Sequence, residues 1–147
     1  MILDKSKLFI RGFKEDDYWF CYRLTKRNML DYVRKYQGGW DAKAYREHFN
    51  SDSIKIVEYN NRRIGLYNVQ KREKELFIID VQVSRQFQNK GLGTYLIEVI
   101  EGDARKKKIG KLTLGVYWDN PSFNLYKRLG FKVFKKKKYF AVMGKNI

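Results

Sequence analysis

The pattern of apolar and polar residues along this chain of 147 residues predicts an alternation of strands and helices. Short runs rich in aliphatic and aromatic residues predict strands at 7–13, 53–59, 63–69, 74–84 and 111–117, and a closing strand pair at 131–134 and 139–143. Start and stop signals predict helices at 17–36, 41–49, 91–108 and 121–129. This order predicts a mixed α/β sheet. Because no repeat or linker interrupts it, we expect a single domain over residues 1–147.

The predicted helix at 91–108 has the clearest amphipathic pattern in the chain. Its apolar residues recur at intervals of three and four positions, at Leu92, Tyr95, Leu96, Val99 and Ile100. The basic residues at 105–108 suit the negative end of the helix dipole, and we expect Gly110 to end the helix.

Turn residues mark the other boundaries. Asn60-Asn61 predicts a tight hairpin between two strands, and Gly38-Gly39 should stop the first long helix. Asp41 is placed to cap the second helix. Pro121 lies near the first turn of the last helix, which Gly130 should close.

Composition adds a large core and a strong positive charge to this picture. The chain is 44% hydrophobic and 16% aromatic, which is typical of a globular protein. Its 32 Lys and Arg against 16 Asp and Glu leave a net charge of +16, which attracts anionic ligands and polyanions without identifying them. Neighbouring side chains on a strand point to opposite faces, so we expect that Lys135 to Lys138 do not form one patch.

The sequence disfavours several classes of protein. A single cysteine, Cys21, excludes an internal disulfide and lies in an aromatic segment, so we interpret it as a buried small hydrophobic residue. No Asp, Glu and His residues have metal-ligand spacing, and the only histidine, His48, is interpreted as a surface or packed residue. The longest aliphatic-aromatic run, 76–79, is too short to span a bilayer, so we expect a soluble, cytoplasmic protein with no membrane partner.

The segment QNKGLGTYL, residues 88–96, lies between a predicted strand and a predicted helix. A glycine loop at the start of a helix can bind phosphate, because the free N–H groups of the first turn point at the anion. A Walker loop needs four residues between its glycines, and a dinucleotide fingerprint needs a third glycine where Leu96 stands, so neither fits. A third pattern, Gln/Arg-x-x-Gly-x-Gly/Ala, fits residues 88–93.

A second motif follows after one predicted helix and one predicted strand. Residues 120–131, NPSFNLYKRLGF, begin with Asn and end in Leu-Tyr-x-x-Leu-Gly-Phe. The two motifs and their spacing, over roughly the last half of the chain, resemble the GNAT superfamily of acetyl-CoA-dependent N-acetyltransferases. The resemblance implies the α/β GNAT fold, with a single mixed, mostly antiparallel sheet of about six to seven strands flanked by about four helices. It also implies transfer of the acetyl group from acetyl-CoA to a primary amine by direct attack in a ternary complex.

The resemblance also implies where acetyl-CoA binds. Backbone amides of residues 89–94 would hold the pyrophosphate, and Lys90 would add charge. Glycine at Gly91 and Gly93 would let the phosphates approach closely. The pantetheine arm would lie beside the central strand, where the N–H of Val81 would polarise the thioester carbonyl. The implied cofactor-binding residues are Val81, Gln82, Val83, Gln88, Asn89, Lys90, Gly91, Leu92, Gly93, Thr94, Asn120, Phe123 and Tyr126.

Acetyl transfer to an amine also needs an acid and a base. Tyr126 matches the family tyrosine near the CoA sulfur, so the resemblance implies that it is the general acid, and a core tyrosine is the alternative. Asp80 is a carboxylate within an apolar strand, on the same face as Gln82, where burial would raise its pKa, and it is the first candidate base. Glu75, which matches a glutamate of some members, and a relay of ordered waters are the other candidates. Gly115 stands where some peptide-acetylating members have a glutamate.

The acceptor amine is left open by the sequence. The resemblance implies that residues 29–49 build the acceptor pocket, with Gly38-Gly39 as a hinge and with Tyr32, Tyr36 and Trp40 as aromatic walls. These aromatic residues could equally tie the helices to the sheet. A small amine and a protein or peptide amine both fit, as do a monomer and a homodimer.

The sequence also fits two alternatives to an active enzyme. One is a basic nucleic-acid-binding or ribosome-binding module, and the other is a GNAT fold that binds CoA without catalysis. For the enzyme itself we expect weak, non-specific binding of polyanions as a secondary property.

Overall fold

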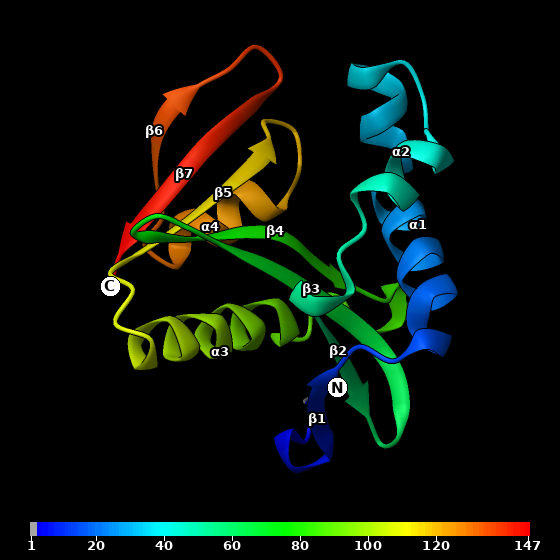
Figure 1. The fold of residues 1–147 in the computed structure, drawn as a ribbon. Coiled ribbons are helices and arrows are strands. Elements are labelled where there is room, and N and C mark those ends of the chain that lie inside the picture. Colours follow the sequence, from blue (N-terminus) through cyan, green and yellow to red (C-terminus); the bar gives the residue numbers. More distant parts are fainter. Residues whose placement is uncertain (1–2) are drawn as a thin grey trace. The chain divides into compact units, whose positions relative to one another are not determined.

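The computed structural model describes residues 3–147 of the chain. These residues form a seven-stranded sheet, with strand order β1-β2-β3-β4-β5-β7-β6, and four α-helices (Figure 1). The strands are β1 (Leu8–Gly12), β2 (Ile54–Tyr59), β3 (Arg62–Arg72), β4 (Glu75–Val83), β5 (Lys111–Tyr117), β6 (Lys132–Lys136) and β7 (Phe140–Asn146). The helices are α1 (Tyr18–Gln37), α2 (Ala42–His48), α3 (Leu92–Lys106) and α4 (Ser122–Arg128).

The sheet mixes both strand directions. The pairs β1–β2, β2–β3, β5–β7 and β6–β7 are antiparallel, whereas β4 and β5 are parallel. The parallel register pairs Leu76–Ile78 with Leu112–Leu114. The predicted mixed sheet of six to seven strands with about four helices is therefore confirmed. None of the helices in the described part of the chain is both long and apolar enough to cross a membrane.

The described residues form two compact units. The first consists of the residues up to Asn68 together with Asp80–Lys90, and the second consists of Val69–Ile79 together with Gly91–Ile147. The first unit holds β1, β2, α1, α2, the first part of β3 and the end of β4. The second holds β5, β6, β7, α3, α4, the end of β3 and the start of β4. That the whole chain acts as one domain stays a prediction.

In the first unit, helix α1 supplies one side of the core. Cys21 and Leu24 of α1 are buried against Ile54, Ile56 and Leu66 of β2 and β3. Fully burying a large aliphatic side chain is worth about 1.5–3 kcal/mol, so this contact holds α1 on the sheet. As predicted, the helix ends at a left-handed glycine, Gly38, whose φ is 79°.

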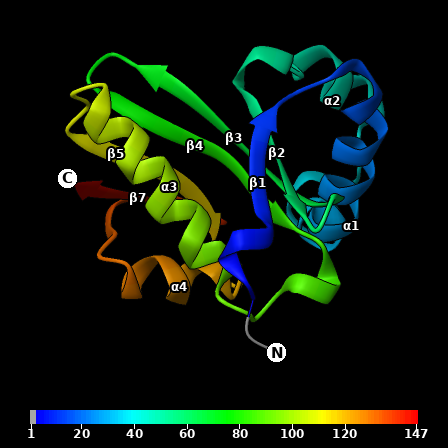
Figure 2. The same ribbon diagram turned by 90° about the horizontal axis from the view of Figure 1, so that it is seen from below.

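In the second unit, α3 and α4 pack against one face of β5. A Cβ atom added to Gly93 of α3 would lie 3.2 Å from Cδ2 of Leu125 in α4, so the two helices touch at this glycine. Figure 2 shows α3 in front of β5, with α4 beside it. The apolar residues of β5 and β7 that point to this side are buried: Leu112, Leu114, Val116, Ala141 and Met143.

Most predicted turns are confirmed. Asn60 and Asn61 both have left-handed backbones, with φ of 51° and 68°, and they join β2 to β3. The carboxylate of Asp41 caps α2 by accepting a hydrogen bond from the N–H of Ala44 at 3.0 Å. Gly130 follows α4 with a φ of 95°. These positive φ values explain why Asn and Gly occupy the turns.

The predicted end of the helix at Gly110 is wrong. Helix α3 ends at Lys106, and the left-handed residue after it is Lys108, whose φ is 57°. The N–H of Ile109 then donates to the carbonyl of Ala104 at 2.9 Å, which closes the helix in a Schellman-type turn. Ile109 is buried, so its packing favours a left-handed backbone at a residue other than glycine.

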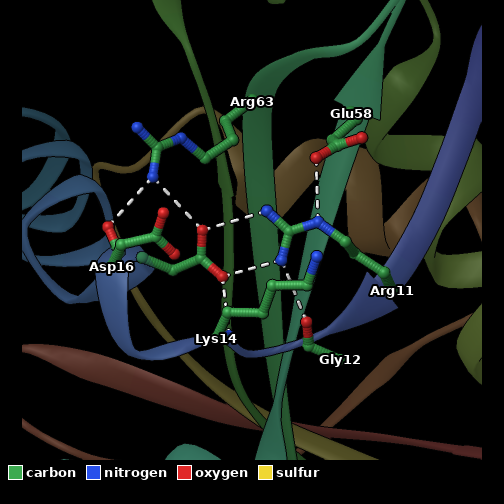
Figure 3. A network of polar contacts seen from close by, with 7 residues as sticks. Arg11, Gly12, Lys14, Asp16, Glu58 and Arg63 are labelled. Carbon is green, nitrogen blue, oxygen red and sulfur yellow. Dashed lines mark hydrogen bonds and ion pairs between the residues drawn. The ribbon is translucent and has the colours of Figure 1, made fainter.

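A buried carboxylate organises the start of α1. Asp17 has no exposed surface, and its oxygens accept two hydrogen bonds from the guanidinium of Arg11, at 2.7 and 3.0 Å (Figure 3). The N–H of Lys14 donates a third at 2.8 Å, and Arg63 donates a fourth at 3.2 Å. Arg11 also donates to Glu58 at 2.8 Å. The network therefore ties β1, β2 and β3 to the residue that precedes α1.

The network changes how Asp17 titrates. Burial alone would raise the pKa of Asp17, but the hydrogen bonds from Arg11, Lys14 and Arg63 outweigh it and lower the pKa to about 2. A lowered pKa means that the folded state binds the proton more weakly than the unfolded state. The resulting stability is present above the unfolded pKa of 3.8 and is lost as the pH falls towards 2.

We expect Asp17→Asn to lower the free energy of unfolding by about 3 kcal/mol at pH 7, because it removes the buried charge that Arg11 and Arg63 both bind. Urea unfolding followed by circular dichroism measures the loss. Asp16→Asn, which removes one charge from an exposed neighbouring residue, is the matched control and should cost less than about 0.5 kcal/mol. Equal losses in the two variants would show that the network does not stabilise the fold.

Candidate active site

Two polar side chains occur on the otherwise apolar face of β4. Leu76 and Ile78 are buried on this face, and Asp80 and Gln82 follow at the next alternate positions. Burial raises the pKa of Asp80 to about 6, although a hydrogen bond from Gln82 acts in the opposite direction. A carboxyl group with this pKa can take up and release a proton near neutral pH, which is the property of a general base.

A chain of hydrogen bonds leads from α1 to Asp80. Nδ2 of Asn28 donates to Oε1 of Gln82 at 3.0 Å and to the carbonyl of Val83 at 3.1 Å. Nε2 of Gln82 donates to Oδ1 of Asp80 at 3.0 Å. A backbone carbonyl can only accept, so the contact with Val83 fixes which end of the Asn28 amide faces β4. That orientation in turn places the amide oxygen of Gln82 towards Asn28 and its NH₂ group towards Asp80.

The carbonyl of Val83 connects this chain of hydrogen bonds to the glycine loop. It accepts from Nε2 of Gln88, the first residue of the loop motif, at 2.9 Å, as well as from Asn28. Two donors use both lone pairs of a carbonyl oxygen. Gln88 therefore anchors the start of the loop to the end of β4.

The backbone of β4 divides its polar groups between two sides. The N–H of Ser84 donates to the carbonyl of Ile64 in β3 at 2.8 Å, and a Cβ atom added to Gly65 would lie 2.8 Å from the carbonyl oxygen of Gln82. The backbone groups of Gln82 therefore face β3, and those of Val81 and Val83 face the other way. Binding of pantetheine by the backbone of residues 81–83 stays a prediction, and in this geometry the backbone groups of Val81 and the N–H of Val83 suit it, because the Val83 carbonyl already accepts two hydrogen bonds.

The loop before α3 leaves a helix N-terminus without a side-chain cap. Asn89 and Gly91 are left-handed, with φ of 60° and 82°, and no side chain caps the helix at Gly91. The first amide of α3 with a backbone acceptor in the helix is that of Tyr95, which donates to the carbonyl of Gly91 at 3.1 Å. The preceding N–H groups, those of residues 92–94, belong to the helix end that attracts anions. This loop fits a pyrophosphate group.

Gly91, Gly93 and Lys90 differ in what they contribute to the loop. Nothing lies within 4 Å of a Cβ atom added to Gly91, so this glycine is required by its left-handed backbone, and the space beside it is open. Gly93 is explained differently, because its missing side chain makes room for Leu125. The ammonium of Lys90 donates to the carbonyl of Gln86 at 2.6 Å, which holds its charge beside the segment before the loop.

The second motif forms the turn into α4. Oδ1 of Asn120 accepts from the N–H of Ser122 at 2.9 Å, so Asn120 caps the start of the helix. The ring of Phe123 lies 5.7 Å from that of Trp118, and the ring of Tyr126 lies 5.7 Å from that of buried Phe131. Capping and packing thus account for part of this motif. The roles of Asn120, Phe123 and Tyr126 towards CoA stay predictions.

Glu75, the other candidate base, lies at the opposite end of β4. Its Oε1 accepts from the hydroxyl of Thr113 at 3.1 Å in the second unit. Five residues separate Glu75 from Asp80, which corresponds to about 17 Å along a strand and to opposite faces. The two carboxylates therefore cannot serve the same amine nitrogen.

The helices predicted to hold the acceptor form an aromatic group. Nε1 of Trp40 donates to the hydroxyl of Tyr22 at 3.1 Å, and the ring of Tyr45 lies 5.3 Å from that of Tyr22. Tyr18 and Phe49 extend the group through further ring contacts. Of the three predicted aromatic walls, Trp40 is part of this group, and the acceptor role of Tyr32 and Tyr36 stays a prediction.

The single histidine and the single cysteine are not placed for chemistry. His48 is exposed, and its Nδ1 lies 2.8 Å from the carbonyl of Ala44 within the same helix. Cys21 is fully buried, and burial raises the pKa of its thiol to about 12. Across residues 3–147, no group of His, Cys, Asp and Glu side chains is arranged to hold a metal ion.

Asn28 is the residue of this site that the sequence analysis did not identify. It continues the buried stripe of α1, since Cys21, Leu24 and Thr25 precede it at helical spacing. A polar residue on a core-facing stripe needs a hydrogen-bonding partner, because an unpaired amide there is costly. A polar residue on this buried stripe therefore indicates a hydrogen bond to another part of the protein. It does not indicate the partner, Gln82, which lies 54 residues further along the chain.

Several solved structures have the same fold at low sequence identity. The chain is 17% identical to PaiA N-acetyltransferase from Thermoplasma acidophilum in complex with coenzyme A, with a TM-score of 0.76 over 95% of this chain and 99% of that one. It is 18% identical to the ribosomal-protein-S18-alanine N-acetyltransferase from Escherichia coli, with a TM-score of 0.75 over 95% and 94%. It is 16% identical to Naa50 from Arabidopsis thaliana in complex with the bisubstrate analogue CoA-Ac-MVNAL, with a TM-score of 0.71 over 96% and 99%. At these identities the likeness shows the fold alone.

The family of the protein is identified from its amino-acid sequence. The model of the acetyltransferase (GNAT) family matches residues 15–131. This span includes α1, the hydrogen-bonded residues Asn28, Gln82 and Asp80, the glycine loop and the Asn120 motif. This match covers well over half of the chain and confirms the resemblance found in the two motifs. The chain belongs to the acetyltransferase (GNAT) family.

Proposed function

We propose that the protein is an N-acetyltransferase that moves the acetyl group of acetyl-CoA to a primary amine by direct attack in a ternary complex. The family match supports acetyl transfer. The complexes of PaiA with coenzyme A and of Naa50 with a CoA-peptide analogue support CoA as the carrier of the acetyl group. The observation that carries the proposal is the half-buried carboxyl of Asp80, which has a pKa of about 6 and is held by Gln82.

Backbone N–H groups would bind and activate the co-substrate. Those of residues 92–94 lie at the uncapped start of α3 and would hold the pyrophosphate. Acetyl-CoA supplies an acetyl group that is already activated as a thioester. The N–H of Val81 would donate to its carbonyl oxygen and stabilise the negative charge that develops there.

Two side chains would move the protons. Asp80 would accept a proton from the ammonium group of the acceptor, directly or through a water, so that the nitrogen lone pair becomes free to attack. The new bond joins this nitrogen to the acetyl carbon, and the bond from that carbon to sulfur breaks. Tyr126 would donate its hydroxyl proton to the departing thiolate, and the second proton that the nitrogen loses as the amide forms would restore the Tyr126 hydroxyl through solvent. Burial is what makes Asp80 suitable, because an exposed aspartate would be too weak a base at neutral pH.

Asn28 and Gln82 are positioning residues in this proposal. The Gln82 amide presents a donor to Asp80 and lowers the pKa that burial raises. Asn28 fixes the direction of that amide through the carbonyl of Val83. The basicity of Asp80 therefore depends on a residue of α1.

We expect Asp80→Asn to lower kcat/KM by about 10²–10⁴-fold in an assay that follows the CoA thiol with a panel of small amines and short peptides. In the wild type, kcat/KM should rise with pH through about 6 as Asp80 ionises, and the variant should lose this step. Glu75→Gln serves as the comparison. If that variant, and not Asp80→Asn, removes the step, the base has been assigned to the wrong carboxylate.

The same variant should be more stable than the wild type at high pH. A raised pKa means that the stability contributed by Asp80 is present below its unfolded pKa of 3.8 and is lost as the pH rises through 6. Asp80→Asn keeps the acceptor for Gln82 and removes the charge, so at pH 8 it should gain up to about 3 kcal/mol in urea unfolding. At pH 4 the gain should disappear. A variant that is less stable at pH 8 would contradict the raised pKa.

We expect Tyr126→Phe to lower kcat by at least about 10²-fold, because the departing thiolate loses its proton donor. Thermal unfolding with and without acetyl-CoA checks that the variant still binds the co-substrate, and a shift of a few degrees should remain. Wild-type turnover by this variant would assign Tyr126 to packing against Phe131 alone.

We expect Gln82→Leu to move the rise of kcat/KM to a pH above 6, because Asp80 loses the hydrogen bond that favours its charged form. Asn28→Leu should move it in the same direction by a smaller amount, with little change in the KM for acetyl-CoA. Since both residues act through one contact, the double variant should match Gln82→Leu. Additive shifts would show that Asn28 acts independently of Gln82.

A further inference from the structure

In the second unit, β5, β7 and β6 have a partly exposed face, here called the open face, on the side away from α3 and α4. The strand register places Gly115 opposite Val142, Gly144 opposite Thr113, and Lys135 opposite Val142. By strand alternation these residues point to the other face of the sheet, where Thr113 is itself buried. Gly115 is exposed on this face, whereas its neighbours Leu114 and Val116 are buried on the helix side.

Two phenylalanine rings lie over the glycines of this face. A Cβ atom added to Gly115 would meet Cδ2 of Phe140 at 3.6 Å, and one added to Gly144 would meet Cε1 of Phe134 at 3.2 Å. Each ring therefore covers a glycine on a neighbouring strand and is not turned into the core. Phe134 is 55% exposed and Phe140 is 37% exposed, so much of each ring is open to solvent.

Lysines surround the two rings. Lys111, Lys132 and Lys135 share the open face by register, and the side chain of Lys137 lies against that of Lys135. The ammonium of Lys111 lies 4.7 Å from the centre of the Phe134 ring. Within residues 3–147, none of these four ammonium groups forms an ion pair with a carboxylate.

The charge of this part of the chain is strongly one-sided. Residues 111–147 contain nine Lys and Arg and one acidic residue, Asp119, so they carry +8 of the net +16. Strict alternation predicted that Lys135 to Lys138 would not form a patch. Lys136 is indeed opposite Ala141 on the other face, but Lys111 and Lys132 from other positions complete the open face. Glu75 of β4 lies at its margin, where Thr113 binds its carboxylate.

We propose that this face, defined by Phe134, Phe140, Lys111, Lys132, Lys135 and Lys137, binds single-stranded nucleic acid. Exposed aromatic rings on a sheet offer stacking surfaces for unpaired bases, and lysines beside them can contact the phosphates between those bases. An acidic protein segment would satisfy the lysines but would leave the rings without a matching partner. A duplex would satisfy the lysines but would keep its bases stacked inside.

Fluorescence anisotropy with labelled U15 and dT15 tests the proposal on the full chain, from 50 to 300 mM NaCl. Saturating CoA is present throughout, so that the anion site at the start of α3 is filled and cannot account for binding. With four lysines on phosphates, log K should fall with log salt at a slope of about −3. Lys135→Gln/Lys137→Gln should weaken binding and reduce this slope by about 1.4.

The matched control is Lys106→Gln/Lys107→Gln. These exposed lysines end α3 in the same unit, and their replacement changes the net charge by the same amount. Phe134→Ala and Phe140→Ala should each weaken binding by about 5- to 100-fold with no change in the salt slope. All four variants alter exposed residues, and thermal unfolding verifies that each is folded.

Three results would overturn the proposal. Equal weakening by the two lysine pairs would show that only net charge matters. Undiminished binding by folded Phe134→Ala and Phe140→Ala, with polyglutamate competing as well as U15, would assign the face to an acidic protein segment. Absence of binding at 50 mM NaCl would indicate instead that the lysines prevent the edge strand β6 from pairing with other chains.

Discussion

The buried carboxylate of Asp17 is the constraint on which the first unit depends. An isolated charge in a protein interior costs several kcal/mol, so Asp17 can be buried only where Arg11, Lys14 and Arg63 converge. Those donors come from β1, β3 and the turn before α1, and Arg11 reaches β2 through Glu58. The network thereby sets where α1 begins on the sheet. Everything that α1 presents to β4 further along, including Asn28, follows from that starting point.

Asp17 and Asp80 show how environment gives one residue type two different pKa values. Both are removed from solvent to different degrees, which by itself raises the pKa of each. Asp17 receives four donors, three of them from guanidinium groups, and stays charged at every physiological pH. Asp80 receives one donor from a neutral amide, and its pKa stays near 6. The number and charge of the donors decide whether a buried carboxylate serves the fold or can exchange a proton.

The order of elements could be predicted from the sequence because their signals are local. Alternation, helical spacing and turn residues identified the strands, α3 and the Asn60-Asn61 hairpin. The end of α3 could not be predicted in this way, since the left-handed backbone of Lys108 depends on where Ile109 is buried. The loop and the Asn120 motif identified the family, and parity placed Asp80 beside Gln82. The same parity separates Glu75 from Asp80, but only the folded structure shows which residues hold each of them.

Contacts that join distant segments of the chain could not be predicted from the sequence. Nothing near Asn28 in the chain indicates Gln82, and nothing near Gly144 indicates that Phe134 covers it. These contacts depend on strand register and on the position of α1, both of which are set by the whole sheet. One such consequence of burial concerns the thiol of Cys21, which lies between α1 and the sheet and has a pKa of about 12. We therefore expect the Cys21 thiol of the native protein not to react with maleimides or aromatic disulfides. A cysteine introduced at the surface can then carry a single spectroscopic label.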